Sequence, residues 1–391
     1  MLTFKRTTIG LVAMTLGYSV LGFRKEIIPS AHLSYPFSAA VRAGNFVYLS
    51  GMLPTDQQGN PVAGTIQEQT KLALTNVAGV LLAADSQLGR VASVSVYLKN
   101  ASDFEAMNEV YRTFWPKDPP ARTTVVTDLP SGALVQIAMV AVRNGVERRV
   151  VHPEGWKKSP NYSYGILSGD TLFLAGLVSR NMKDSSIVEG NIGIQTKTVL
   201  GNAGEILQAA GMSHSDVVSS RVFLTDAARF QDMNAAYRPF FAKHPPARAT
   251  VKAALMNPQF AVEITLLAVK SNDREAINPP GPDGPPYSSA IRVGNRLYVA
   301  GMVGGSETSK GDMRAQTRES LDRIGKTVRA AGFDWAKVVD AIVYVTDLKR
   351  SVEMNEAYRE TFPADFPART VVGIEIVIPN PMVEIMLTAV K

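Results

Sequence analysis

The alternation of apolar and polar residues predicts the same short series of strands and helices in successive parts of the chain. In the first part, residues 39–41 and 47–49 read as short strands on either side of Gly44-Asn45, a pair typical of a tight turn. Apolar residues then recur at spacings of three and four over Glu68–Ala84, as in an amphipathic helix. The series therefore opens with a hairpin and a helix.

The second half of the series adds another helix between strands. Val94–Leu98 is rich in β-branched and aromatic residues, which favours a buried strand. Asp103–Phe114 has helical periodicity, with Asp103 suited to cap its start and a cluster of prolines ending it. Ala133–Val142 is a long apolar strand. The predicted order is close to ββαβαββ, an α+β sheet with two helices on one face.

This series occurs three times along the chain. The phrase that ends at Gly51 recurs 125 residues later, ending at Gly176, and 125 residues later again, ending at Gly301. Two further motifs recur in the same order, Met-Asn-x-x-Tyr-Arg at 107–112, 233–238 and 354–359 and Pro-Ala-Arg at 120–122, 246–248 and 367–369. A period this long indicates duplicated domains, because solenoid repeats span only about 20 to 50 residues.

The repeat defines the expected domain organisation. A single unit would leave one face of its sheet uncovered, so we expect three units to pack sheet against sheet around a pseudo-threefold axis. Such a chain is expected to be a monomer with internal pseudo-threefold symmetry. The predicted units are residues 30–145, 150–270 and 287–391, with a proline-rich linker at 271–286.

Composition narrows the class of protein. The chain has 391 residues, of which 46% are apolar and 19% charged, so it is neither a disordered tail nor a polytopic membrane protein. It contains no cysteine, which excludes thiolate nucleophiles, cysteine-ligated metal sites and disulfides. None of its four histidines recurs in the repeat or forms a metal-ligand spacing, so no metal is expected.

The net charge does not indicate a nucleic-acid partner. The chain carries a formal +6, and half of that excess comes from residues 5–26, ahead of the first predicted unit. Basic and aromatic residues do not gather in one stripe. We therefore expect no binding of nucleic acid.

The N-terminus has the pattern of a targeting segment. An uncharged apolar run, Ile9–Phe23, lies between Lys5-Arg6 and Arg24-Lys25. Residues 1–29 are therefore predicted to be a signal peptide or a membrane anchor, and the protein to be exported or anchored, in the periplasm if bacterial. The alternatives are a frayed helix of the first unit and a cytoplasmic protein. Whether the segment is cleaved stays open.

Taken together and in order, the repeated motifs resemble the RidA/YjgF family, also called L-PSP or Rid, whose members are small trimeric enamine/imine deaminases. The motifs are G-[ND]-x-x-x-x-[SA]-G, Gln-Thr, M-N-x-x-Y, P-A-R-[TA] and a closing V-[QE]-I strand. The resemblance runs from about residue 30 to the end. It implies three RidA-like (chorismate-mutase-like) units in an intramolecular pseudo-trimer, with ligand clefts between neighbouring units.

The resemblance also implies site residues. Its arginine fits a carboxylate-bearing ligand, because a guanidinium offers two parallel donors. Its buried acid is expected to pair with a nearby arginine and to position water, although an outward-facing place on the strand is the alternative. The implied catalytic set is Arg248, Arg369, Glu263, Glu384, Tyr162 and Tyr287. The implied substrate-binding set is Arg122, Asn108, Asn234, Asn355, Ser50 and Gln136.

The first unit departs from the family pattern. Gln136 stands where the other units have a glutamate, and Phe37 where they have a tyrosine. Conversely, Ser50 is replaced in the later units by Ala175 and Ala300. Because an amide cannot accept a proton from water at neutral pH, we expect the cleft that contains Gln136 to be impaired or repurposed.

The resemblance implies hydrolysis of reactive 2-imino or enamine acids to 2-keto acids and ammonia, without a cofactor. The alternative is a non-catalytic module that binds a small carboxylate or a partner protein. RNA cleavage, an activity with which the family has also been labelled, has no support in the distribution of basic and aromatic residues.

Overall fold

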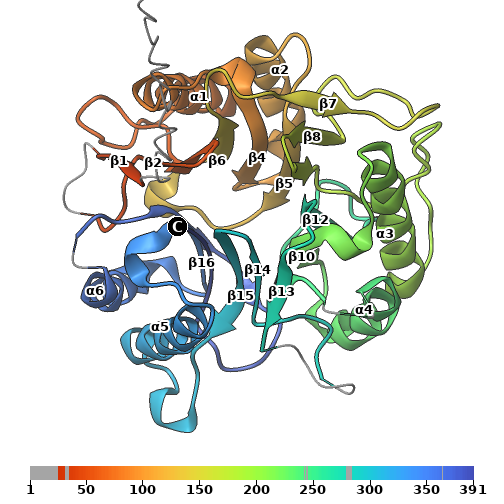
Figure 1. The fold of residues 1–391 in the computed structure, drawn as a ribbon. Coiled ribbons are helices and arrows are strands. Elements are labelled where there is room, and N and C mark those ends of the chain that lie inside the picture. Colours follow the sequence, from red (N-terminus) through yellow and green to blue (C-terminus); the bar gives the residue numbers. More distant parts are fainter. Residues whose placement is uncertain (1–24, 31–34, 242, 244, 279–283, 363) are drawn as a thin grey trace, which may run out of the picture.

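Three strand–helix units fold into three sheets arranged around a common axis (Figure 1). The computed structural model describes residues 25–30, 35–241, 243, 245–278, 284–362 and 364–391. The predicted α+β fold of three RidA-like units in an intramolecular pseudo-trimer is confirmed.

The three units repeat one order of elements. The first contains β1 (Glu26–Ile28), β2 (Ala40–Ala43), β3 (Phe46–Met52), α1 (Ile66–Ala83), β4 (Val91–Leu98), α2 (Phe104–Phe114), β5 (Ala121–Val126) and β6 (Val135–Val142). The second contains β7 (Arg149–Val151), β8 (Gly165–Ser168), β9 (Thr171–Leu174), α3 (Ile192–Ala209), β10 (Val217–Leu224), α4 (Phe230–Tyr237), β11 (Ala247–Lys252) and β12 (Val262–Val269). The third contains β13 (Arg274–Ile277), β14 (Ala290–Val293), β15 (Arg296–Val303), α5 (Met313–Ala330), β16 (Val338–Val345), α6 (Ser351–Thr361), β17 (Ala368–Gly373), β18 (Glu375–Ile376) and β19 (Val383–Val390).

Each sheet has the same strand order. In the first unit the order is β1-β2-β3-β6-β4-β5, and the third unit repeats it as β13-β14-β15-β19-β16-β17. The second sheet follows the same order and gains β18 from the third unit, which pairs antiparallel with β11. The strand before the second helix and the strand after it run parallel, as a helical crossover requires.

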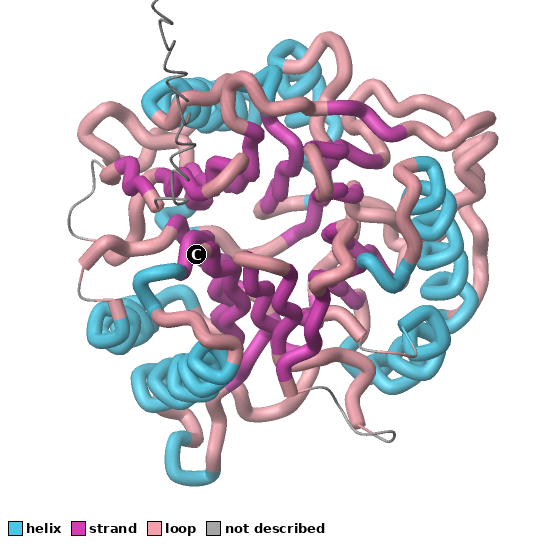
Figure 2. Tube along the Cα trace, viewed as in Figure 1, coloured by secondary structure: helices cyan, strands magenta, loops and turns pink. Residues whose placement is uncertain are grey.

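The helices lie on the outside and the sheets face the centre (Figure 2). Between helices and sheet, every unit has a hydrophobic core of its own. A further core joins the inner sheet faces and includes Tyr97, Phe223 and Tyr344, one aromatic residue from each unit. The sheet face that a single unit would expose is therefore buried against the other two units.

The first long helix of each unit is fixed at its N-terminus. Thr65 and Glu68 form a capping box at α1. The glutamine of each Gln-Thr pair is buried and accepts a hydrogen bond from a backbone N–H just before the last strand of the unit. These bonds are Leu134 to Gln69 (2.8 Å), Ala261 to Gln195 (2.8 Å) and Met382 to Gln316 (2.6 Å). Each bond ties the start of a helix to the start of the strand that carries Gln136, Glu263 or Glu384.

Three equivalent serines join the units in a closed ring. The hydroxyl and the N–H of Ser163 donate to the carbonyls of Pro119 (2.6 Å) and Pro120 (3.1 Å), next to the Pro-Ala-Arg motif of the first unit. Ser288 makes the same pair of bonds to the second unit, and Ser38 makes it to the third. Each serine follows the aromatic residue that the family resemblance singles out, so that residue is brought beside an arginine of another unit.

Two local predictions need correction. Asp103 directly precedes α2, but its side chain makes no capping bond to that helix, because a 3₁₀ turn, Ala101–Asp103, comes first. Residues 271–286, predicted as a linker, contain the edge strand β13, which pairs with β14. The short, partly charged β1 and β7 occupy the same edge in the other sheets. Strands of three or four residues give too little alternation to be recognised in a sequence.

The predicted targeting segment, including Ile9–Phe23, lies outside the described residues. Of the helices in the described part of the chain, none has both the length and the apolar character needed to cross a bilayer.

Candidate functional site

The predicted site residues meet at three seams, each formed by two units. At the first seam, Arg122 of the first unit interacts with Tyr162 and Glu263 of the second. At the second seam, Arg248 of the second unit interacts with Tyr287 and Glu384 of the third. The third seam contains Arg369 of the third unit and, from the first unit, Ser50, Gln136 and Phe37. We call these the 1–2, 2–3 and 3–1 seams.

This grouping changes the roles expected from the sequence. Arg122, placed among the binding residues, shares a seam with a glutamate and a tyrosine. Arg369, placed in the catalytic set, lies instead at the seam with Gln136, because Ser50 of the first unit accepts a hydrogen bond from the Arg369 N–H (2.7 Å). Each seam joins an arginine from one unit to residues of the next, which are a glutamate and a tyrosine at the 1–2 and 2–3 seams and Gln136 and Phe37 at the 3–1 seam.

Each arginine is held over the ring of a tyrosine from its own unit. The three arginines lie near the start of β5, β11 and β17 and are at most 5% exposed. Their guanidinium carbons lie over the rings of Tyr111 (4.6 Å), Tyr237 (4.8 Å) and Tyr358 (4.7 Å). These tyrosines belong to the Met-Asn-x-x-Tyr motif on the second helix of each unit. The aromatic face stabilises the buried positive charge by cation–π attraction, and the N–H groups of the guanidinium stay available for hydrogen bonds.

The arginines at the first two seams keep a free donor. Nη1 of Arg122 and Nη1 of Arg248 are buried and have no hydrogen-bond partner within the described part of the chain. No carboxylate of the described residues lies within 4.0 Å of either guanidinium. Burial lowers the pKa of both arginines, yet an arginine stays charged at neutral pH. Each seam thus holds a buried cation with a donor available to an anion.

The glutamates are buried and are not in contact with these arginines. Burial raises the pKa of Glu263 to about 8, and the Thr124 N–H and the Arg122 charge only partly oppose that effect. The pKa of Glu384 rises to about 8 for the same reason, opposed by the Thr250 N–H and Arg248. The arginine expected near each acid is present and interacts with it electrostatically, but among the described residues the two do not form an ion pair. Both carboxyl groups are predominantly protonated at neutral pH.

The glycine of the [SA]-G pair makes room for these acids. A Cβ on Gly176 would lie 2.0 Å from Glu263 Oε1, and a Cβ on Gly301 would lie 1.8 Å from Glu384 Oε1. No real Cβ approaches an oxygen so closely, so a side chain at either position would displace the carboxyl group. The repeated Gly51 motif found in the sequence thus marks the wall of the site.

The 3–1 seam keeps the arginine without the acid. Gln136 donates from Nε2 to the Gly51 carbonyl (3.4 Å), and its buried Oε1 has no partner among the described residues. Burial lowers the pKa of Arg369 to about 10. The Ser50 hydroxyl already makes two structural hydrogen bonds, since it accepts from the Arg369 N–H and donates to the Ser38 carbonyl (2.6 Å). Its predicted role in substrate binding is therefore not supported by its contacts.

The three asparagines differ in their contacts. Asn234 Oδ1 accepts a hydrogen bond from Arg248 Nη2 (2.7 Å), so it orients that guanidinium. Asn108 is fully buried, and neither its amide nitrogen nor its oxygen has a partner in the described chain. Asn355 Oδ1 is also without a partner there. Buried amide groups without a partner are suited to bind a polar ligand.

The stacking tyrosines and the threonine N–H donors were not among the predicted residues. Tyr111, Tyr237 and Tyr358 recur with the motif, and this recurrence was the signal that could have identified them. The donors Thr124 and Thr250 are backbone groups, which no residue pattern reveals. Within the described residues, no cluster of three or more histidine and acidic side chains could hold a metal ion.

Comparison with known proteins decides the family. The model of the family described as Endoribonuclease L-PSP matches residues 29–143, 156–270 and 278–391. The chain belongs to the L-PSP family. A RutC family protein of Pyrococcus horikoshii is 41% identical over 110 residues, which are 28% of this chain and 87% of that protein. The L-PSP relatives thus correspond to single units.

A second L-PSP relative carries an activity in its name. The 2-iminobutanoate/2-iminopropanoate deaminase of Dermatophagoides farinae is 38% identical over 109 residues, covering 27% of this chain and 85% of that protein. A crystal structure of a chorismatase covers 77% of this chain and 93% of its own, with a TM-score of 0.50 and 15% identity. At that identity the likeness concerns the fold alone.

Proposed function

We propose that this protein hydrolyses 2-imino or enamine acids to 2-keto acids and ammonia at its 1–2 and 2–3 seams. The observation that supports this proposal is the combination, at both seams, of a buried arginine with a free donor and a buried, protonated glutamate from the neighbouring unit. The named deaminase among the relatives makes this reaction class the one to test first.

The arginine binds and orients the substrate. Nη1 of Arg122, or of Arg248 at the second seam, donates to the substrate carboxylate, whose charge replaces the missing counter-ion. The phenol of Tyr162 or Tyr287 lies beside the same arginine. Burial excludes water from the pair, which strengthens the attraction between guanidinium and carboxylate.

The glutamate moves protons in both directions. Because Glu263 begins protonated, it can donate to the enamine carbon or the imine nitrogen, which makes the C=N carbon more electrophilic. The resulting carboxylate then takes a proton from a water molecule as that water forms the C–O bond. The same carboxyl group returns the proton to the nitrogen of the carbinolamine and accepts the hydroxyl proton as the C–N bond breaks. The products are a 2-keto acid and ammonia, and the glutamic acid is regenerated.

The 3–1 seam supports a second, non-catalytic function. It has a buried arginine, but Gln136 cannot exchange protons with water, and Phe37 has no phenol. A carboxylate ligand could bind Arg369 there without reacting. Binding at this seam and turnover at the other two are compatible in one molecule.

The test measures ammonia release from freshly generated 2-iminopropanoate. The double variant Glu263→Gln/Glu384→Gln makes both seams resemble the 3–1 seam, whose natural glutamine shows that the fold tolerates the amide. We expect kcat/KM to fall by about 10² to 10⁴, the usual contribution of a general acid–base group. Each single variant should keep roughly half of the turnover, because the two seams are independent.

The matched control is Glu154→Gln, which alters an exposed glutamate in the loop after β7 and should leave ammonia release unchanged. Undiminished activity in the double variant would show that these seams are not where the reaction takes place.

A further inference from the structure

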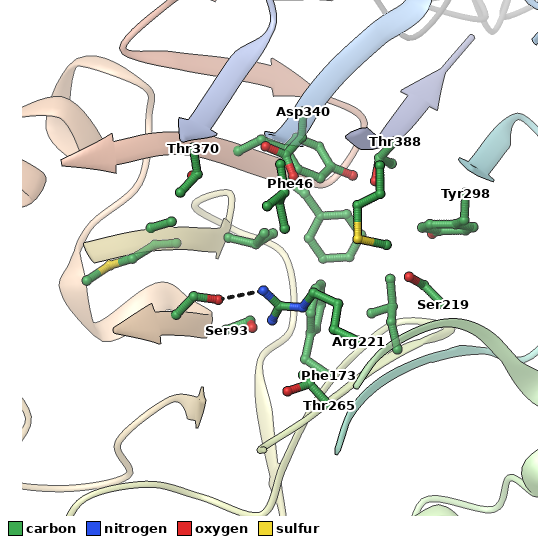
Figure 3. Close-up of a pocket in the computed structure, with 18 of the residues that line it drawn as sticks. Phe46, Ser93, Phe173, Ser219, Arg221, Thr265, Tyr298, Asp340, Thr370 and Thr388 are labelled. Carbon is green, nitrogen blue, oxygen red and sulfur yellow. Dashed lines mark hydrogen bonds between the residues drawn. The ribbon is translucent and has the colours of Figure 1, made fainter. Parts of the chain in front are cut away.

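A second polar site, separate from the three seams, lies on the pseudo-threefold axis. A cavity of about 130 Å³ is lined by equivalent strands of all three sheets, among them β4, β10 and β16. Figure 3 shows Arg221 and Asp340 at this cavity, on strands of different sheets. Hydroxyl-bearing residues also line it, among them Ser93, Ser95, Ser219, Thr265 and Thr388.

The two charged residues of this cavity are not repeated at the equivalent positions of the other units. Arg221 occupies the position held by Ser95 in the first unit and Ile342 in the third. Asp340 occupies the position of Ser93 and Ser219. Three identical subunits would place three like charges together on the axis, which is unfavourable. One covalent chain allows a single cation and a single anion there.

These two opposite charges do not form an ion pair with each other. Arg221 Nη1 donates to Ser95 Oγ (2.9 Å), and no Asp340 oxygen lies within 4.0 Å of its nitrogens in the described chain. Asp340 lines the cavity and keeps some accessible surface. Burial raises its pKa to about 7, and the Arg221 charge opposes this effect only in part. Such a carboxyl group is ready to gain a positively charged or hydrogen-bonding partner.

We propose that the axial cavity binds a small zwitterionic amino acid, with its carboxylate on Arg221 and its ammonium on Asp340. A ligand with only one charge would satisfy one of these residues and leave the other desolvated and unpaired, whereas a zwitterion satisfies both. The volume sets the size limit, since a cavity of about 150 Å³ accommodates benzene. Glycine, alanine and serine are within that limit. This site goes beyond the proposed deaminase reaction and does not depend on it.

The experiment is isothermal titration calorimetry of the full chain with L-alanine. Propionate, which lacks the ammonium group, and ethylamine, which lacks the carboxylate, are titrated in parallel. We expect one molecule of alanine to bind per chain and each single-charge probe to bind at least about tenfold more weakly, as the loss of one charged hydrogen bond predicts. Absence of alanine binding, or equal binding of all three probes, would overturn the proposal.

Variants then locate the binding. Arg221→Ser and Asp340→Ser install residues that the same chain already carries at equivalent positions, so both are suited to fold. Each should weaken alanine binding at least about tenfold, while Glu384→Gln at the 2–3 seam, whose carboxyl group interacts with Arg248 and not with Arg221, should leave it unchanged. Alanine binding that survives both axial substitutions, or that is lost in the seam variant, would refute the axial site.

Discussion

At the scale of the residue, the same strand position carries different chemistry in different units. Glu263 and Glu384 are buried without a contacting cation, so the neutral form of each is favoured. Gln136 occupies the corresponding place and is neutral at every pH. The environment thus sets the acid's starting protonation state, and the residue type decides whether a proton can be transferred at all.

The raised pKa values predict how stability depends on pH. Between about pH 4.5, where an unfolded glutamate ionises, and about pH 8, where Glu263 and Glu384 ionise in the fold, the native state holds more protons than the unfolded state. The free energy of unfolding should therefore fall as pH rises through this window, by up to about 1.4 kcal/mol per pH unit for each group.

Urea denaturation between pH 5 and pH 8 checks this prediction. Glu263→Gln/Glu384→Gln should reduce the slope by the contribution of both carboxyl groups, because an amide does not titrate. Asp340, whose pKa burial raises to about 7, accounts for part of the slope that remains. If the slope of the double variant equalled that of the unchanged chain, the two carboxyl groups would not be ionising in this window.

At the scale of the element, each site depends on a tie between a helix and a strand. Gln195, at the start of α3, is 3% exposed and makes three hydrogen bonds. One of them accepts the Ala261 N–H, two residues before Glu263 on β12. The Gln-Thr motif therefore acts as a positioning device: it sets where the last strand of the unit begins and where its acid points.

Replacing this glutamine should be costly. Gln195→Ala removes the side-chain partner of the Ala261 N–H and of the Gly190 and Gln259 carbonyls. These three bonds are partly buried, and we expect a loss of about 1 to 3 kcal/mol in the free energy of unfolding. Gln208→Ala, at an exposed position near the end of the same helix, is the control and should change stability by less than about 0.5 kcal/mol. Similar losses for the two variants, measured by thermal or urea unfolding, would contradict the proposed tie.

At the scale of the whole molecule, the fusion of three units makes the seams unequal. Three bonds of the same kind, from Ser38, Ser163 and Ser288, close the ring. The side chains beside them differ, so that two seams carry the acid and the phenol and one carries neither. The same freedom places a single cation and a single anion on the axis. A trimer of identical chains could make neither arrangement.

Restoring the missing groups should create a third working seam. Phe37→Tyr combined with Gln136→Glu supplies the phenol and the acid beside Arg369. Ammonia release from 2-iminopropanoate should then rise by about half, since three independent seams replace two.

Two controls test the origin of that gain. Phe37→Tyr alone should produce none, and adding Arg369→Ala to the double variant should remove it. A gain that persists without Arg369 would show that it does not arise at the 3–1 seam.

Much of this architecture could be predicted from the sequence. The threefold repeat, the long helices and the long strands follow from hydrophobic spacing over many residues, which is a strong signal. The arginines, the acids and the substitutions at Gln136 and Phe37 are visible because each can be compared with two other copies in the same chain. The three-residue strands β1 and β7 leave no such pattern.

Which residues share a site was decided only by the tertiary structure. The grouping of Arg122 with Glu263, and of Arg369 with Gln136, depends on the direction in which the units follow one another around the ring. Hydrophobic periodicity specifies each unit's inner face but is the same for either direction. The charges in the sequence have the same limit as a guide to the site. Arg221 and Asp340 line one cavity only because strands from distant segments come together on the axis.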